Sequence, residues 1–235
     1  MKYRTVFISD IHLGTHGCRA HDLLTFLNNM ECETLYLVGD VIDVWALKWH
    51  FHWPESHMNV LQKFLDIANS ATKVKLIPGN HDELFKDLVG LRLSNIEILL
   101  EDTFVSKKGK KYLVMHGDKH DVFHVHFKWI SKLCTRFQSR SERFGAYFSS
   151  NHKVSKKLKG VVKNAARHIN RFEKAIVKEA KNRGYDGVLC GHFHSPAQKM
   201  IDGIEYINDG DWVQHRTAFV EELDGTMKLL DFKDL

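Results

Sequence analysis

Five short apolar runs, each closed by a cluster of polar or glycine residues, constrain the fold of this 235-residue chain more than any other feature. Each run holds four or five residues that are mostly aliphatic, and residues typical of turns bound it, which is the pattern of a buried β-strand. The runs are TVFIS before Asp10, TLYLV before Gly39-Asp40, VKLIP before Gly79-Asn80, KYLVM before His116, and GVLC before Gly191-His192.

Helical patterns separate the first three runs. Residues 19–30 and 55–70 have the length of helices, and apolar residues recur at helical spacing in the second segment. Strands that alternate with helices form βαβ units around a largely parallel sheet, so the chain is predicted to be an α/β protein. The last quarter alternates apolar and polar residues around Asp-Gly pairs at 202–203 and 224–225, which predicts β-hairpins.

The composition indicates one globular domain over residues 1–235, because 43% of the residues are hydrophobic and 27% are charged. No apolar run approaches the roughly 18–20 residues that cross a bilayer. The start, MKYRTVFISD, lacks the apolar core of a signal peptide. The four cysteines are scattered, so we expect reduced thiols in a cytoplasmic protein.

The positive charge is concentrated in residues 119–165, a basic and aromatic segment that we expect to form a helical lid inserted into the domain. It holds eleven Lys and Arg against two acidic residues, a net charge of +9, and seven aromatic residues lie among them. The whole chain carries only +5, so the remainder carries −4. The basicity therefore indicates a local partner and argues against general nucleic-acid binding.

Metal-ligand residues stand at the end of every predicted strand, and the carboxyl ends of parallel strands share one edge of a sheet. The set is Asp10, His12, Asp40, Asn80, His116, His192 and His194. Oxygen and imidazole ligands without thiolates suit manganese, iron or zinc. Seven groups exceed the needs of one ion and suit two ions, about 3.5–4 Å apart, that share a carboxylate.

The blocks SDIH, GDVIDVW, PGNHDE, MHGD and CGHFH resemble the five signature blocks of the calcineurin-like metallophosphoesterases, in the same order, over residues 9–195. The resemblance implies a sandwich of two packed mixed sheets flanked by helices. It implies that Asp40 bridges two ions and that His81 is the acid at the leaving oxygen, with Asp43 orienting His81. The implied ligands are Asp10, His12 and His194 for the first ion, and Asn80, His116 and His192 for the second.

Longer phrases such as SDIHLGTHGCRA, YLVMHGDKHDV and YINDGDWV are similar to the UDP-2,3-diacylglucosamine hydrolases of lipid A synthesis, and more closely to a paralogous branch of that family. The resemblance implies hydrolysis of UDP-2,3-diacylglucosamine to 2,3-diacylglucosamine 1-phosphate (lipid X) and UMP, usually with Mn²⁺. The third block reads GNHD, where those hydrolases have GNRD. Phosphomonoesterase or phosphodiesterase activity on a phosphoprotein, a nucleotide or nucleic acid, or a non-catalytic scaffold, stays an alternative.

The segment WALKWHFHWP at residues 45–54 follows the GDVID block and is expected at the rim of the site. Arg19, Trp45 and Lys48 are predicted substrate contacts. A cationic, aromatic lid suits an anionic, lipid-linked nucleotide and a peripheral contact with the inner leaflet of the cytoplasmic membrane. The sequence leaves the oligomeric state open. It also leaves open whether Asp82 supports the site or caps a turn, whereas Asp211 is predicted to have a local turn role.

Overall fold

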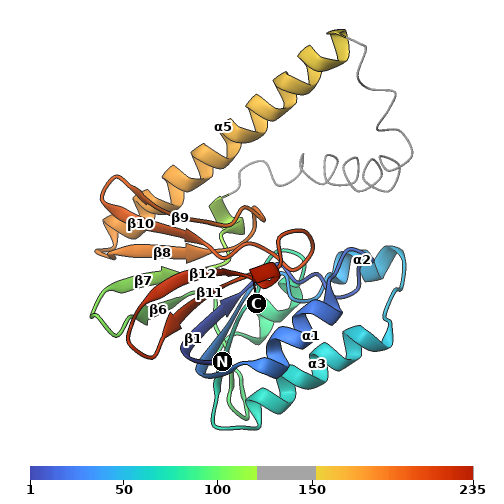
Figure 1. Cartoon of the computed structure of the whole chain (residues 1–235), viewed down its shortest axis with the longest axis vertical. Helices are drawn as coiled ribbons and strands as arrows, with labels where there is room; N and C mark the ends of the chain where they lie inside the picture. The colour runs from blue at the N-terminus through green and yellow to red at the C-terminus, as the bar shows by residue number, and fades with distance from the viewer. Residues whose placement is uncertain (121–151, 235) are drawn as a thin grey trace. The chain divides into compact units, whose positions relative to one another are not determined.

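The computed structural model describes residues 1–120 and 152–234 (Figure 1). The chain divides into two compact units, one of Met1–Gly117 with Ile176–Leu235 and one of Asp118–Ala175. Most of the predicted lid, residues 121–151, lies outside the described residues, so the lid stays a prediction. In the second unit, the described elements are the short helix η2 (Asp118–His120) and the beginning of α5 (His152–Asn182).

The first unit contains two mixed sheets. The first sheet has the strand order β12-β11-β1-β2-β3-β5-β4, and the second has the order β6-β7-β8-β10-β9. The strands of the first sheet are β1 (Lys2–Ile8), β2 (Glu31–Val38), β3 (Lys73–Ile77), β4 (Arg92–Leu93), β5 (Ile96–Ile98), β11 (Thr217–Glu222) and β12 (Met227–Asp231). Those of the second are β6 (Asp102–Val105), β7 (Lys111–Val114), β8 (Gly187–Cys190), β9 (Ala197–Ile201) and β10 (Ile204–Asn208).

The pairing confirms the α/β class and the two mixed sheets. Strands β1, β2, β3 and β5 are parallel, and so are β7, β8 and β10. The two predicted hairpins are β9–β10 and β11–β12, which turn at the two Asp-Gly pairs. The second hairpin joins the first sheet because β11 pairs antiparallel with β1, so this sheet is mixed and the largely parallel pairing predicted from the alternating strands and helices was wrong.

Helices cover one face of the first sheet, and the second sheet covers the other. The helices are α1 (Ala20–Asn29) and α3 (Glu55–Ala68). The short α2 (Val44–Trp49) precedes α3, and the 3₁₀ helix η1 (Glu83–Leu88) follows β3. Successive residues of β1 point to opposite faces. Val6 and Ile8 therefore belong to the core with α1 and α3, whereas Phe7 packs between the sheets against Tyr36 and Phe104.

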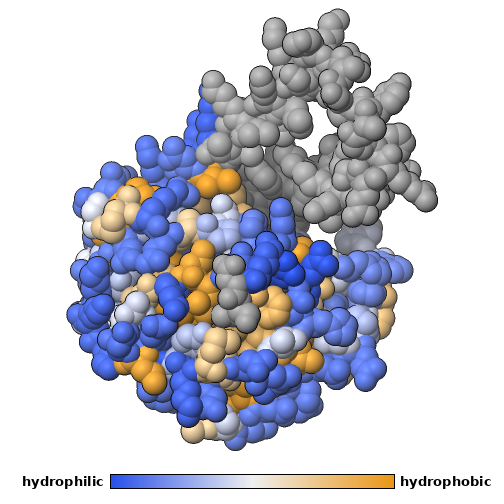
Figure 2. Space-filling model, in the orientation of Figure 1, coloured by the Kyte–Doolittle hydropathy of each residue, from blue (hydrophilic) through white to orange (hydrophobic). Residues whose placement is uncertain are grey.

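On the face that Figure 2 shows, most described residues are hydrophilic, and apolar residues gather mainly near the centre of the view. Among the residues that the structure describes, no helix is long and apolar enough to cross a membrane. Cys18, Cys32 and Cys190 are free thiols. Cys134 lies outside the described residues.

Candidate metal centre

Loops at the carboxyl ends of five parallel strands bring the predicted ligands together. Ligand atoms within 4.8 Å of one another form the groups Asp10–His12–His194, Asp40–His116–His192 and His12–Asp43–His81. Positive φ angles, from +49° to +72°, occur at Asp10, His12, Asp40, His192 and His194. Such backbone costs about 1–3 kcal/mol per residue and persists mainly where function requires it. The strained backbone at these five positions therefore indicates that the loops serve to direct the candidate ligand side chains.

The first group combines the end of β1 with the loop after β8. His194 Nε2 lies 3.1 Å from Asp10 Oδ1 and 3.2 Å from His12 Nε2. Neighbouring ligand atoms that are each about 2.1 Å from one ion lie roughly 3.0–3.4 Å apart, which both His194 distances match. Asp10 Oδ1 and His12 Nε2 lie farther apart, at 4.0 Å. Burial would raise the pKa of Asp10, but the imidazoles of His194 and His116 together outweigh burial and lower the pKa to about 2.

The second group joins β2, β7 and the loop after β8. His116 donates from Nδ1 to the carbonyl of Val38 at 2.9 Å, which turns Nε2 toward Asp40 Oδ2 at 3.4 Å. The same Asp40 oxygen lies 3.9 Å from His12 Nε2, a member of the first group. One carboxylate oxygen therefore faces both groups, an arrangement that suits a bridging ligand.

His81 and Asp43 form a dyad beside the two groups. His81 Nδ1 lies 2.9 Å from Asp43 Oδ2, and His81 Nε2 lies 4.0 Å from Asp40 Oδ2. Asp43 Oδ2 also lies 3.1 Å from His12 Nδ1, so this carboxylate contacts both His81 and a residue of the first group. Burial alone would lower the pKa of His81, but Asp43 and Asp40 outweigh it and raise the pKa.

Two buried oxygen atoms that lack hydrogen-bond partners, and three glycines that leave room for the ligand side chains, make this centre suitable for metal ions. Among the described residues, Asp10 Oδ1 and Asn80 Oδ1 are buried without a hydrogen-bond partner, which is costly unless something else binds them. A Cβ atom at Gly79 would lie 2.2 Å from Asp40 Oδ1, and one at Gly191 would lie 2.3 Å from Asp10 Oδ2. At Gly39, where φ is +86°, it would lie 2.1 Å from His116 Nδ1.

Asp82 supports the site, which resolves the question that the sequence left open. Its Oδ1 accepts hydrogen bonds from Gly79 N (2.6 Å) and Asp40 N (3.3 Å), and its Oδ2 accepts one from Val41 N (2.8 Å). Its side chain makes no cap hydrogen bond to η1. Asp82 therefore joins the loops after β2 and β3.

Asp211 has the predicted turn role. Its Oδ1 accepts from Val213 N at 2.7 Å and from His215 N at 3.2 Å.

Sequence reasoning missed the support from Ser9, Asn208 and Asp209. Asn208 donates to the carbonyl of Gly191 at 2.7 Å, and Ser9 Oγ lies between Asp10 and Asp209. Ser9 stands inside the SDIH block and the other two inside YINDGDWV, but none of the three was singled out as a candidate site residue. The only sequence feature that could have identified these three residues is their position within the SDIH and YINDGDWV motifs.

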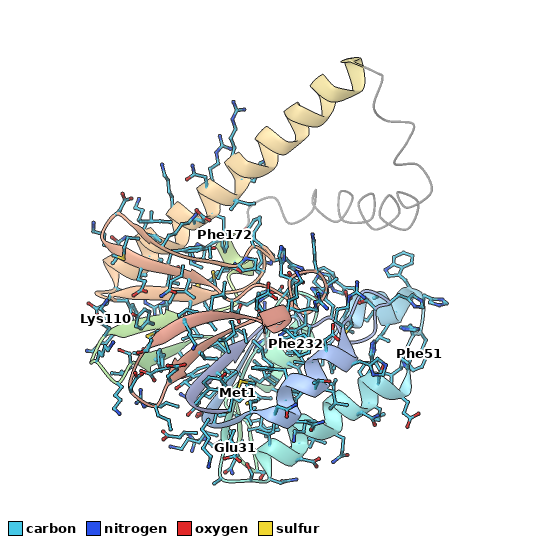
Figure 3. All side chains as sticks on the ribbon, in the orientation of Figure 1. Met1, Glu31, Phe51, Lys110, Phe172 and Phe232 are labelled. Carbon is cyan, nitrogen blue, oxygen red and sulfur yellow. The ribbon has the colours of Figure 1, made fainter. Side chains whose placement is uncertain are left out.

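Of the three predicted substrate contacts, the structure brings only Trp45 next to a residue of the candidate site. The Trp45 ring lies 4.4 Å from the His81 ring, so it borders the site. Arg19 precedes α1, with Nε donating to the carbonyl of Val213 at 3.4 Å, and Lys48 is exposed in the last turn of α2. Phe51, 76% exposed, projects from the loop between α2 and α3 (Figure 3). The structure thus brings Trp45 to the ligand set, and substrate binding by all three stays a prediction.

Comparisons with known proteins agree with this geometry. The family model described as calcineurin-like phosphoesterase matches residues 3–196. The UDP-2,3-diacylglucosamine hydrolase of Shewanella sp. (strain W3-18-1) is 23% identical, with 90% of each chain covered. That of Haemophilus influenzae (strain PittGG) is 25% identical, with 92% of this chain and 93% of the relative covered. A hypothetical protein of Pyrococcus horikoshii OT3 shares the fold at a TM-score of 0.54 and 13% identity, with 100% of this chain and 92% of that chain covered.

Proposed function

This chain belongs to the calcineurin-like phosphoesterase family, and from that premise we propose that it is a phosphohydrolase working with two divalent metal ions. The observation that carries the proposal is the single Asp40 oxygen that faces both ligand groups, 3.4 Å from His116 Nε2 and 3.9 Å from His12 Nε2. Hydrolysis of a phosphoester anion is among the slowest uncatalysed reactions in water, so its catalysis requires strong local positive charge.

The proposed ligands of the first ion are Asp10, His12 and His194, and those of the second are Asn80, His116 and His192, with Asp40 shared. Divalent ions of this kind lower the pKa of water from 15.7 to about 7 and offset the charge of the phosphate. We expect Mn²⁺ to be preferred, with Fe or Zn as alternatives, because the donors are carboxylate, amide and imidazole groups.

His81 is the proposed acid. Asp43 lies against Nδ1 and leaves Nε2 directed at the site, so a proton on Nε2 can pass to the leaving oxygen of the substrate. Asp43 and Asp40 raise the pKa of His81, which favours its protonated form. Proton transfer by a positioned side chain contributes about 10²–10⁴-fold to rate.

We propose that the substrate is UDP-2,3-diacylglucosamine or a similar nucleotide-linked glycolipid, cleaved to 2,3-diacylglucosamine 1-phosphate and UMP. Three observations support this substrate: relatives that are 23–25% identical over 90% or more of the chain are UDP-2,3-diacylglucosamine hydrolases, Trp45 borders the site, and residues 119–165 are basic and aromatic in composition. Such a substrate places the protein in the cytoplasm, in contact with the inner leaflet.

The test of the catalytic proposal is turnover of bis-p-nitrophenyl phosphate by the full chain with Mn²⁺. Asp40→Asn should abolish turnover, because both ligand groups lose their common oxygen. His81→Gln should retain measurable activity, lowered about 10²–10⁴-fold. Asp87→Asn, an exposed acid on η1, is the matched control and should behave like the parent chain. Equal activity of Asp40→Asn and the parent would refute the assignment.

The test of the substrate is the rate on UDP-2,3-diacylglucosamine compared with its deacylated analogue. A strong preference for the acylated form supports the glycolipid. Equal rates on the two compounds would discard the acyl-recognition role, while leaving the phosphohydrolase proposal standing.

A further inference from the structure

The hydroxyl of Ser9 lies between two buried carboxylates at the edge of the first ligand group. Ser9 Oγ is 2.5 Å from Asp10 Oδ2 and 2.6 Å from Asp209 Oδ1. Asp10 and Asp209 are both fully buried, and Ser9 is nearly so. Both distances are those of strong O–H···O hydrogen bonds.

A serine hydroxyl carries one proton, so it can donate to only one of these carboxylates. If both acids were ionised, the other oxygen would face the hydroxyl oxygen at 2.6 Å with no hydrogen between them. One carboxyl must therefore carry a proton and donate it to Ser9 Oγ, because a buried acceptor pair without a hydrogen is strongly unfavourable.

The surroundings identify the neutral acid. Asp10 has His194 Nε2 at 3.1 Å from Oδ1, and its Oδ2 accepts from His192 N at 2.9 Å, both of which favour the carboxylate. Asp209 has no ion pair among the described residues, and its Oδ2 is buried there without a hydrogen-bond partner. Burial raises the pKa of Asp209 well above that of an ordinary carboxyl group.

We propose that Ser9 and Asp209 are positioning residues of the first metal group, in which neutral Asp209 donates to Ser9 Oγ and Ser9 donates to Asp10 Oδ2. The inference rests on the proposed function, because it assigns the remaining oxygen, Asp10 Oδ1, to an ion. Two hydrogen bonds, from Ser9 Oγ and His192 N, fix Oδ2 and leave Oδ1 as the single ligand atom.

These two hydrogen bonds, from Asp209 to Ser9 and from Ser9 to Asp10, form a relay that is anchored to β8, the strand before the loop of His192 and His194. Asp209 N donates to the carbonyl of Cys190 at 3.1 Å, and Thr217 Oγ1 donates to the carbonyl of Asp209 at 2.7 Å. Cys190 is the last residue of β8, directly before the loop with His192 and His194. The relay therefore holds the end of β1 and the end of β8 in one register, which sets the distance between Asp10 and His194.

Manganese binding tests the positioning role. Calorimetric titration of the full chain should show two Mn²⁺ sites, and Ser9→Ala should weaken one of them about 10–100-fold, the usual effect of removing such support. Asp209→Asn should stay within about threefold of the parent, because its amide can donate to Ser9 as the neutral acid does. Ser106→Ala, a buried serine in the turn between β6 and β7, is the matched control. Unchanged affinity in Ser9→Ala would overturn the proposal.

Infrared spectroscopy tests the proton itself. The chelated parent chain should show the C=O stretch of a protonated buried carboxyl at neutral pH, and Asp209→Asn should lose it. Absence of such a band from the difference spectrum would overturn the relay. This readout needs neither metal nor turnover, so it separates failure of the relay from failure of the proposed function.

Discussion

Replacing Asp82 by Asn should reduce the stability of the chain even though it changes only one atom of the side chain. Three backbone N–H groups, of Gly79, Asp40 and Val41, converge on the two oxygens of this fully buried carboxylate. An asparagine that keeps its oxygen toward Gly79 and Asp40 turns its NH₂ group toward Val41 N–H. The NH₂ group and Val41 N–H are then two donors that face each other. In the opposite orientation of the amide, its NH₂ group would face two backbone donors, Gly79 N–H and Asp40 N–H.

The magnitude follows from the buried donor that is left without an acceptor, which costs about 1–3 kcal/mol. With an m-value of about 2 kcal/mol/M, the urea midpoint should fall by roughly 0.5–1.5 M. The assay is urea unfolding of the chelated protein, followed by circular dichroism. Asp87→Asn is the control and should stay within about 0.5 kcal/mol, as exposed substitutions do. An Asp82→Asn chain as stable as this control would show that the three hydrogen bonds do not hold the loops.

Burial lowers the pKa of His57, whose Nδ1 accepts from Gly14 N, so its unfolded form binds the proton more readily and the native state loses stability as pH falls below about 6.5. Between pH 7.5 and pH 5.5, the unfolding free energy of His57→Gln should fall less than that of the parent chain, by up to about 1.4 kcal/mol per pH unit. Equal falls in the two chains would contradict this. Gly187→Ala places a Cβ 2.5 Å from the Tyr112 ring, and thermal unfolding should report a loss of about 1–3 kcal/mol, which an unchanged midpoint would exclude. Trp212→Ala removes a buried ring and should lower the unfolding free energy in urea by about 3–5 kcal/mol; a loss under 1 kcal/mol would mean that the core refills the space.

Much of the fold could be predicted from the sequence because the apolar pattern of each segment matches the strand or helix that the segment forms. The five apolar runs became β1, β2, β3, β7 and β8, and residues 19–30 and 55–70 became α1 and α3 with small changes at their ends. The elements that were missed are short: α2, η1, β4, β5 and β6 have two to six residues each. So few residues leave no measurable periodicity, and their conformation depends on the neighbours against which they pack.

The clustering of the candidate ligands was predictable for a similar reason, since each candidate stands beside a turn that ends a strand. Asp82 was ambiguous because a carboxylate after a strand can cap a helix or bind a neighbouring loop equally well. Its hydrogen bond to Val41 spans 41 residues, and no local pattern encodes that choice. Arg19 and Lys48 were named from charge alone, which does not fix where a side chain points.

The sequence by itself determined the strand-forming runs, the helices that separate them and the identity of the groups able to bind metal, because these depend on neighbours along the chain. Only the tertiary structure decided that β11 lies beside β1, that one Asp40 oxygen faces both ligand groups, and that Ser9 meets Asp209 across 200 residues. Contacts between distant segments arise from how two sheets pack and twist together, and that arrangement is the sum of many weak burial and hydrogen-bond terms that no short stretch of sequence contains.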